Sequence, residues 1–119
     1  IANFHSFIQQ TYRSPGKLNA YFIILGYVPA NDGFSKGFTV EKVYLKRIWE
    51  ITNKATKYPI GLQVKRKAPY AIRPCSFHKK DSFKNKEEFI EAIYETFKKF
   101  PSEELNFTPQ EWKKKVLAY

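Results

Sequence analysis

The sequence contains no methionine and a single cysteine, Cys75. One cysteine cannot form a disulfide within the chain, so a reducing compartment is the simpler expectation, either cytoplasmic or nucleoid-associated. Long apolar runs are also missing, because residues 20–25 form the longest one and a membrane helix needs about 20 residues. These absences argue against a disulfide-stabilised scaffold and against a membrane partner.

Position 1 also lacks the methionine that starts a complete translation product. We therefore expect residues 1–119 to be a single domain excised or processed from a larger protein, with further domains in the parent chain. A chain of this length can bury roughly two thirds of its unfolded surface in one core. Its hydrophobic content of 43% argues against disorder.

Acidic residues are absent from residues 51–80, which hold eight Lys or Arg and therefore +8 of the net charge of +10. So concentrated a positive field favours a polyanionic partner, because neutralising phosphates releases condensed counterions. Tyr58, Tyr70 and Phe77 stand among these cations, and aromatic rings in such surroundings can stack on unpaired bases. The pattern predicts binding to nucleic acid, either DNA or RNA.

Capping signals predict three helices. Asn3 precedes an apolar stripe that is typical of a short helix, and Asn85 with Glu88 forms a capping box for a helix over about 86–100. The sequence Thr108-Pro109-Gln110-Glu111 starts a last helix at about residue 109. The apolar stripes of these two later helices place four side chains in the predicted core: Phe89, Ile93, Phe97 and Trp112.

The segments between these helices predict strands and one more helix. The apolar stretch 18–28 indicates a buried strand, central in a sheet. Helical spacing after a Thr39 cap predicts a helix over about 40–53, although the β-branched and aromatic residues there also favour a strand. Alternation over 58–67 and a short edge strand over 70–77 predict a hairpin. The order α-β-α-β-β-α-α predicts an α+β fold, a small mixed or antiparallel sheet with helices packed on it.

The hairpin is the predicted contact element. Its cations would bind phosphates, Gln63 could read a base edge, and Tyr58 or Tyr70 could stack. A lysine-rich sheet edge that prevents aggregation is the simpler alternative, but the missing acidic residues favour binding because solvated faces usually mix both signs. The predicted nucleic-acid-binding residues are Lys54, Lys57, Tyr58, Gln63, Lys65, Lys67, Tyr70, Arg73, His78, Lys79 and Lys80.

The tripeptide Gln63-Val64-Lys65 resembles the end of the nuclease motif in the restriction-endonuclease-like fold, where an acidic or amide residue and a lysine flank one apolar position on a strand. The resemblance implies a bound metal beside both side chains, with Mg²⁺ as the cofactor of a nuclease. Gln63 lacks the usual carboxylate charge, and the upstream acid would be Asp32, Glu41 or Glu50. Three residues of many strands match this pattern, so a plain strand stays the favoured interpretation.

A metal-independent nuclease is also compatible with the sequence. His78 could act as general acid or base while a neighbouring cation stabilises the charge at phosphorus. The catalytic residues of a nuclease would then be His78 or Lys65. Cys75 and His78 lack two further ligands at suitable spacing, so we expect no protein metal site and no cofactor outside the nuclease hypothesis.

The sequence therefore predicts a nucleic-acid-binding domain, part of a DNA-processing protein, that uses a basic hairpin within residues 54–80. The alternative is a small nuclease that cleaves RNA or DNA, such as the toxin domain of a longer secreted or injected protein. A second alternative is a protein-interaction module for an acidic partner. Whether the chain is an enzyme is left open by the sequence.

Overall fold

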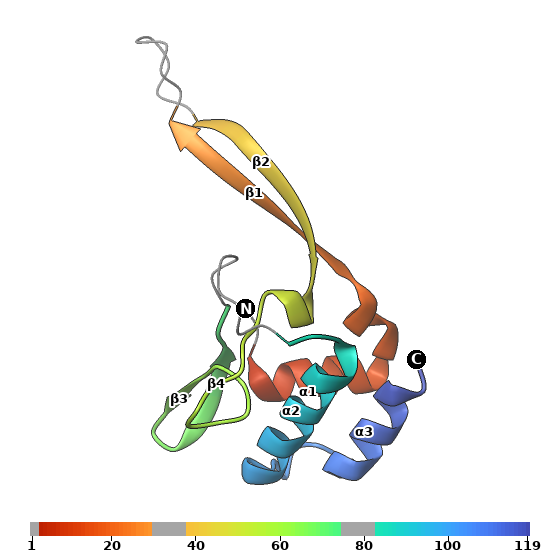
Figure 1. Cartoon of the computed structure of the whole chain (residues 1–119). Coiled ribbons are helices and arrows are strands. Elements are labelled where there is room, and N and C mark those ends of the chain that lie inside the picture. Colours follow the sequence, from red (N-terminus) through yellow and green to blue (C-terminus); the bar gives the residue numbers. More distant parts are fainter. Residues whose placement is uncertain (1–2, 30–37, 75–82) are drawn as a thin grey trace.

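The computed structural model describes residues 3–29, 38–74 and 83–119, and it confirms the α+β class (Figure 1). Within these ranges the strands form two separate antiparallel pairs, β1 with β2 and β3 with β4. The elements in chain order are α1 (Phe4–Arg13), the 3-10 helix η1 (Pro15–Asn19), β1 (Tyr21–Pro29), β2 (Phe38–Arg47), the 3-10 helix η2 (Ile48–Glu50), β3 (Leu62–Lys65), β4 (Ala68–Ile72), α2 (Lys86–Lys99) and α3 (Pro109–Leu117).

The three predicted helices are confirmed as α1, α2 and α3, and each predicted N-cap side chain accepts a backbone hydrogen bond. The capping box predicted for Asn85 and Glu88 forms only in part, because the Glu88 carboxylate binds Lys54 and the Lys84 N–H instead. The Asn3 side chain accepts a hydrogen bond from the Ser6 backbone N–H at 3.1 Å, and Asn85 accepts one from the Glu88 backbone N–H at 2.9 Å. Thr108 and Glu111 form a complete capping box at α3. These caps satisfy N–H groups that have no partner inside a helix, which is why each helix starts where the sequence predicts.

The helix predicted over 40–53 is wrong: this segment forms β2 and then η2. Strand β2 pairs with β1 in an antiparallel register, with Leu45 opposite Ile23 and Tyr44 opposite Ile24. β-branched and aromatic residues suit a paired strand. The cap predicted at Thr39 is also wrong, because this residue lies inside β2 opposite Val28.

The prediction that residues 18–28 form a strand in the centre of a sheet is wrong in its position. Leu18 belongs to η1 and is buried, whereas β1 has only β2 as a neighbour among the described strands. Figure 1 shows β1 and β2 as a long ribbon that projects from the helical body, and we call this ribbon the arm. The radius of gyration is 16.9 Å, above the about 13.5 Å of a compact chain of this length.

The predicted hairpin is confirmed in shorter form as β3 and β4, with Leu62 opposite Ile72. Its connection is not residues 67–69 but the two residues Arg66 and Lys67. Two kinds of contact fix the position of the hairpin on the body. Ile60 and Ile72 are buried in the core, and Asn3 forms an isolated antiparallel bridge with Ala71.

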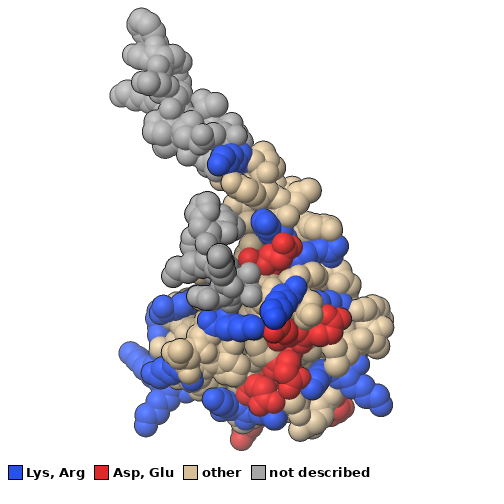
Figure 2. All heavy atoms as spheres, in the orientation of Figure 1, with Lys and Arg blue, Asp and Glu red and all other residues tan. Residues whose placement is uncertain are grey.

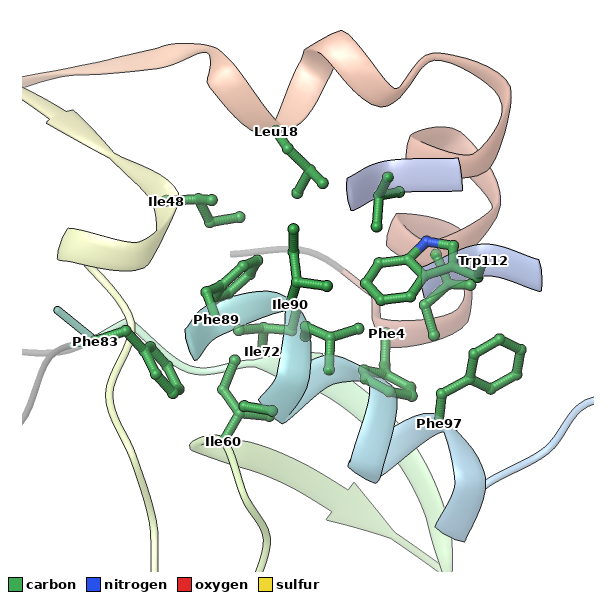
Figure 3. Packing of buried hydrophobic residues seen from close by; sticks show 14 of the residues in the cluster. Phe4, Leu18, Ile48, Ile60, Ile72, Phe83, Phe89, Ile90, Phe97 and Trp112 are labelled. Atoms are coloured by element: carbon green, nitrogen blue, oxygen red, sulfur yellow. The ribbon is translucent and has the colours of Figure 1, made fainter. Parts of the chain in front are cut away.

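The core lies where α1, α2 and α3 meet the hairpin (Figure 3). The four predicted core residues are confirmed, since Phe89, Ile93 and Trp112 are fully buried and Phe97 nearly so. The Trp112 indole N–H donates a hydrogen bond to Thr11 Oγ at 2.9 Å, so α3 and α1 share a buried polar contact. None of the described helices combines the length and the hydropathy that crossing a bilayer requires.

Candidate nucleic-acid interface

Lys and Arg side chains gather around β3, β4 and their connecting turn, which we call the basic hairpin (Figure 2). The exposed cations of its tip are Lys65, Arg66 and Lys67. Acidic side chains lie instead along α2, where Glu88 and Glu91 begin a run that faces the loop before the hairpin. The cations of the hairpin tip therefore lie apart from this acidic run, whereas Lys54 of the same acid-free stretch is paired with Glu88.

The tip of the basic hairpin is a two-residue turn in an unusual backbone conformation. Arg66 has φ of 53° and Lys67 has φ of 64°, as the two central positions of a type I′ turn require. Such turns usually carry Asn-Gly, because other residues lose roughly 1–2 kcal/mol each in the left-handed region. The turn therefore places two adjacent cations at the end of the hairpin, in a backbone conformation that lowers the stability of the fold.

A bulge in β4 exposes Tyr70. Gln63 pairs with Ala71 and Val64 pairs with Pro69, so the register skips Tyr70. A residue left out of the ladder can aim its side chain away from the sheet. The Tyr70 side chain is 49% exposed, and the Lys65 ammonium lies 4.4 Å from the centre of its ring. The structure thus brings together a predicted phosphate contact and a predicted stacking ring.

A cavity of about 510 Å³ opens beside β3, and three of the predicted residues line it: Lys57, Tyr58 and Arg73. Asn53 and Val64 are among the other residues that line it. The cavity combines two cations, one ring and one amide, a set that can hold a phosphate and a neighbouring base or sugar. It is the largest concentration of predicted site residues outside the turn.

Gly61 holds the two walls of this cavity together. Its backbone N–H donates to the Asn53 carbonyl at 2.9 Å, and its carbonyl accepts from the Arg73 N–H at 2.9 Å. A Cβ at this position would lie 2.5 Å from Asn53 Oδ1, so a side chain would displace Asn53. The Asn53 carbonyl oxygen would lie at an ordinary 3.7 Å, so the Asn53 side chain alone would have to move.

Two of the predicted residues have structural contacts of their own. The Tyr58 ring is partly buried and lies 5.4 Å from the Phe100 ring between centres, so one side of it packs against the core. Gln63 is partly buried within β3. Stacking by Tyr58 and base recognition by Gln63 therefore stay predictions. Both side chains are less exposed than that of Tyr70.

Lys54 lies apart from the basic hairpin and is paired. Its ammonium lies 2.9 Å from Glu88 Oε1, and Glu88 Oε2 accepts a hydrogen bond from the Lys84 N–H at 2.7 Å. The Lys54 hydrogen bond, followed by the one from Lys84, lowers the pKa of the Glu88 carboxyl below its ordinary value. Lys54 is therefore a weaker candidate for contact with phosphate than the tip cations.

Three predicted residues, His78, Lys79 and Lys80, lie outside the described residues, as does Phe77. Among the residues that are described, the predicted set missed Arg66 and Asn53. Arg66 was counted among the cations of the sequence, and a turn of only two residues would have placed it at the hairpin tip. No local sequence pattern marks Asn53 as a site residue, because it reaches the cavity only through its contact with Gly61.

Carboxylates do not gather near the basic hairpin in the described part of the chain, where no three His, Cys, Asp or Glu side chains could jointly hold a metal ion. Of the upstream acids, Asp32 lies outside the described residues and Glu41 belongs to β2. The Glu50 carboxylate accepts a hydrogen bond from the Arg47 backbone N–H at 2.9 Å. That contact caps η2. Among the described side chains, therefore, no group of three possible metal ligands lies beside the tripeptide Gln63-Val64-Lys65.

Each of the three comparisons with known proteins finds restriction endonucleases. The family model described as NgoBV restriction endonuclease matches residues 1–119. The type II restriction enzyme NlaIV of Neisseria lactamica is 32% identical over 120 residues, which cover 97% of this chain and 47% of that enzyme. The solved structure of the NlaIV restriction endonuclease superposes with a TM-score of 0.79 at 29% identity, over 98% of this chain and 47% of that one. The chain thus spans about half the length of these relatives.

Proposed function

Because the chain belongs to the NgoBV restriction endonuclease family, we propose that it forms part of an enzyme that cleaves DNA, and that the basic hairpin contacts the DNA backbone. The family match across residues 1–119 is the observation that carries the proposal. It favours the nuclease alternative over a domain that only binds nucleic acid. The relatives reported above are restriction enzymes rather than toxins.

We assign phosphate contacts to the exposed cations of the hairpin tip, Lys65, Arg66 and Lys67. Phosphate contacts position a protein on DNA, and cations at the end of a projecting hairpin can reach a groove edge without collision from the body. Arg73 and Lys57 would bind a neighbouring phosphate at the 510 Å³ cavity. These assignments rest on exposure, charge and proximity.

Nucleases of this kind generally use Mg²⁺, whose preferred ligands are oxygen atoms. The described residues do not fit such a site, because they provide no cluster of carboxylates beside Lys65. We therefore derive no catalytic step through a metal from these residues. Catalytic roles for Lys65 and His78 stay predictions.

The binding part of the proposal is tested by salt titration with duplex DNA. About four to six phosphate contacts would give a log-log salt slope of roughly −3 to −5. Lys65→Ala and Lys67→Ala should each reduce the slope by about 1, whereas Lys114→Ala, an exposed lysine on α3, should not change it. If the DNA affinity of the wild type does not change with salt concentration, this surface does not contact the DNA backbone.

The cleavage part is tested by incubating the full-length protein with labelled duplex DNA, single-stranded DNA and RNA of one sequence, with Mg²⁺ or with a chelator. We expect cuts in duplex DNA and only with Mg²⁺. Cleavage that survives the chelator and is lost in His78→Ala would favour the metal-independent mechanism. If the protein binds these substrates but cleaves none of them, the proposal of a nuclease is wrong and the chain is a binding domain.

A further inference from the structure

The cavity beside β3 is lined by two chemically different sets of side chains. Lys57 and Arg73 are exposed cations. Leu62 is buried and Val64 is half-buried, and alternation places both on one face of β3. None of the described residues that line the cavity is acidic. The cavity therefore suits a ligand that has an anionic group and an apolar group.

Tyr58 joins the core to this cavity. Its ring packs against the Phe100 ring at 5.4 Å between centres with a tilt of 58°, and it also lines the cavity. The Lys57 ammonium lies 5.7 Å from the centre of the same ring. A ring that is already held by packing on one side loses little freedom when a ligand stacks on it. Tyr58 is therefore suited to bind a planar group.

Asn53 adds an amide to the cavity. Its backbone carbonyl accepts a hydrogen bond from the Gly61 N–H at 2.9 Å, and its Oδ1 occupies space that a side chain at Gly61 would need. A side-chain amide offers a donor and an acceptor in one plane, so it can bind the edge of a nucleobase.

The volume of the cavity, about 510 Å³, distinguishes a bare phosphate from a larger ligand. Pockets for small organic ligands measure about 300–1,000 Å³ and combine apolar walls with a few polar groups. A phosphate alone would bind the cations and leave Tyr58 and Leu62 uncovered. A nucleotide contacts all parts of the cavity, since its phosphate pairs with cations and its base stacks on a ring.

We propose that this cavity binds one nucleotide, with the base stacked on Tyr58, the base edge at Asn53 and the phosphate between Lys57 and Arg73. The nucleotide comes from the DNA that the basic hairpin contacts, so this source rests on the function proposed above. A base paired within a duplex cannot enter a concave site. The nucleotide must therefore swing out of the helix.

The hairpin brings DNA close enough for this. Leu62 at the cavity and Lys65 at the hairpin tip are the two ends of β3. Three residues of strand span about 10 Å, which is about three base pairs along a duplex. A DNA strand held by the tip cations therefore passes the cavity. A free nucleotide has the same chemistry, and the test separates the two sources.

The first measurement titrates each deoxynucleoside monophosphate into the full-length protein without DNA, and follows the backbone amide signals of Gly61 and Arg73 by NMR. Deoxyribose 5-phosphate is the control ligand, because it has the phosphate but no base. Tyr58→Leu removes the ring and keeps an apolar side chain against Phe100. Tyr58→Phe keeps the ring, and Arg73→Gln removes one cation.

Two matched variants lie outside the cavity. Tyr94→Leu replaces a half-buried tyrosine of α2, and Arg13→Gln replaces an exposed arginine of α1. We expect at least one nucleotide to bind about tenfold or more tightly than deoxyribose 5-phosphate. Tyr58→Leu and Arg73→Gln should each weaken its binding about tenfold. Tyr58→Phe and both matched variants should bind like the wild type.

The second measurement uses duplex DNA that carries the fluorescent adenine analogue 2-aminopurine at each position of the bound site in turn, in both strands. Stacking within a duplex quenches the analogue, so an extruded base and the partner that it leaves behind both brighten. A several-fold rise at one position, lost at full DNA occupancy in the double variant Tyr58→Leu with Arg73→Gln, supports the proposal and assigns the nucleotide to DNA. Nucleotide binding without such a rise assigns it to a free nucleotide.

Two results would overturn the proposal. One is equal affinity for nucleotides and deoxyribose 5-phosphate without brightening at any position, because the cavity would then hold only a phosphate. The other is nucleotide binding or brightening that Tyr58→Leu and Arg73→Gln leave unchanged, because the ligand would then lie elsewhere. A protein that binds no duplex DNA would refute the proposed function, while the nucleotide titration would still decide what the cavity binds.

Discussion

The ammonium of Lys65 lies over the ring of Tyr70, 4.4 Å from its centre. The contact joins the last residue of β3 to the residue that the register of β4 skips. An ammonium over an aromatic face is held by the ring quadrupole, by about 0.5–1 kcal/mol at an exposed site. Tyr70 therefore offers one free face to a ligand while it orients the cation on the other.

Tyr70→Ala should separate binding from folding. The side chain is half exposed, so we expect a small loss of stability. Binding to single-stranded DNA should weaken by about 1–3 kcal/mol for one lost stacking contact. Tyr119→Ala, which removes an equally large ring that is 66% exposed at the last residue of the chain, is the control. Melts and binding curves on both variants provide the measurement, and a strongly lowered Tm for Tyr70→Ala would place this ring in the core instead.

The turn at Arg66 and Lys67 predicts opposite effects on stability and binding. Replacing the pair by Asn-Gly suits the positive φ of both positions, so the free energy of unfolding should rise by about 1 kcal/mol. The same change removes two cations from the tip and should weaken binding to DNA. Urea unfolding and salt titrations measure the two effects.

Lys114→Gly is the control for the turn variant, because it also replaces a lysine by glycine but lies inside α3. It should lower the free energy of unfolding by about 1 kcal/mol. If the turn variant is also destabilised, the left-handed conformation of the turn is not the source of strain that we infer.

Thr11→Val tests the buried polar contact between α1 and α3. The Trp112 indole N–H donates to Thr11 Oγ, and valine keeps the shape of threonine but removes the acceptor. A buried donor without a partner costs about 1–3 kcal/mol, which chemical denaturation can measure. Thr96→Val is a matched control, since the buried Thr96 hydroxyl bonds the Ala92 carbonyl of its own helix and leaves no side-chain donor unpaired. Equal costs for both variants would refute a special role for the indole contact.

The ion pair of Glu88 and Lys54 predicts a pH dependence of stability. The pKa of Glu88 is lowered in the folded protein, chiefly by the hydrogen bond from Lys54. Its stabilising effect is therefore complete above the ordinary glutamate value of 4.5 and is lost as pH falls through the lower pKa of the folded state. Glu88→Gln should flatten the fall in stability below that value.

Lys54→Gln should flatten the same acid limb, and the double variant should add little to either change, because the two side chains form one contact. Unfolding curves at a series of acidic pH values supply the comparison. Additive effects of the two substitutions would show that the pair does not act as a unit.

Local signals predicted much of this fold. The helices were predicted because caps such as Asn3 and Thr108 act over three residues, and the distances involved do not depend on the rest of the chain. The arm was missed because the apolar spacing of 40–53 fits a helix as well as a strand. Residues 38–47 form a strand because they pair with residues 21–29, and a local sequence pattern does not predict that pairing.

The same division holds for the site. The exposure of Lys65 followed from alternation along its strand, whereas the exposure of Tyr70 also depends on a bulge in β4 that the sequence did not predict. The pairing of Lys54 with Glu88 did not follow from a local pattern, since the two residues lie 34 positions apart and meet only when α2 packs beside the loop. Gly61 and Asn53 likewise approach only in the folded chain.

The arm joins the body at one end, and its strands have no further described strand beside them. Its backbone hydrogen bonds therefore open without disturbing the core around Trp112 and Phe89. In amide hydrogen exchange the arm of a single chain should form a separate cooperative unit that exchanges long before α2. A partner packed on the exposed side chains of Ile23 and Leu45 would slow this exchange along the whole ribbon, so the exchange rate of the arm shows whether that surface is covered.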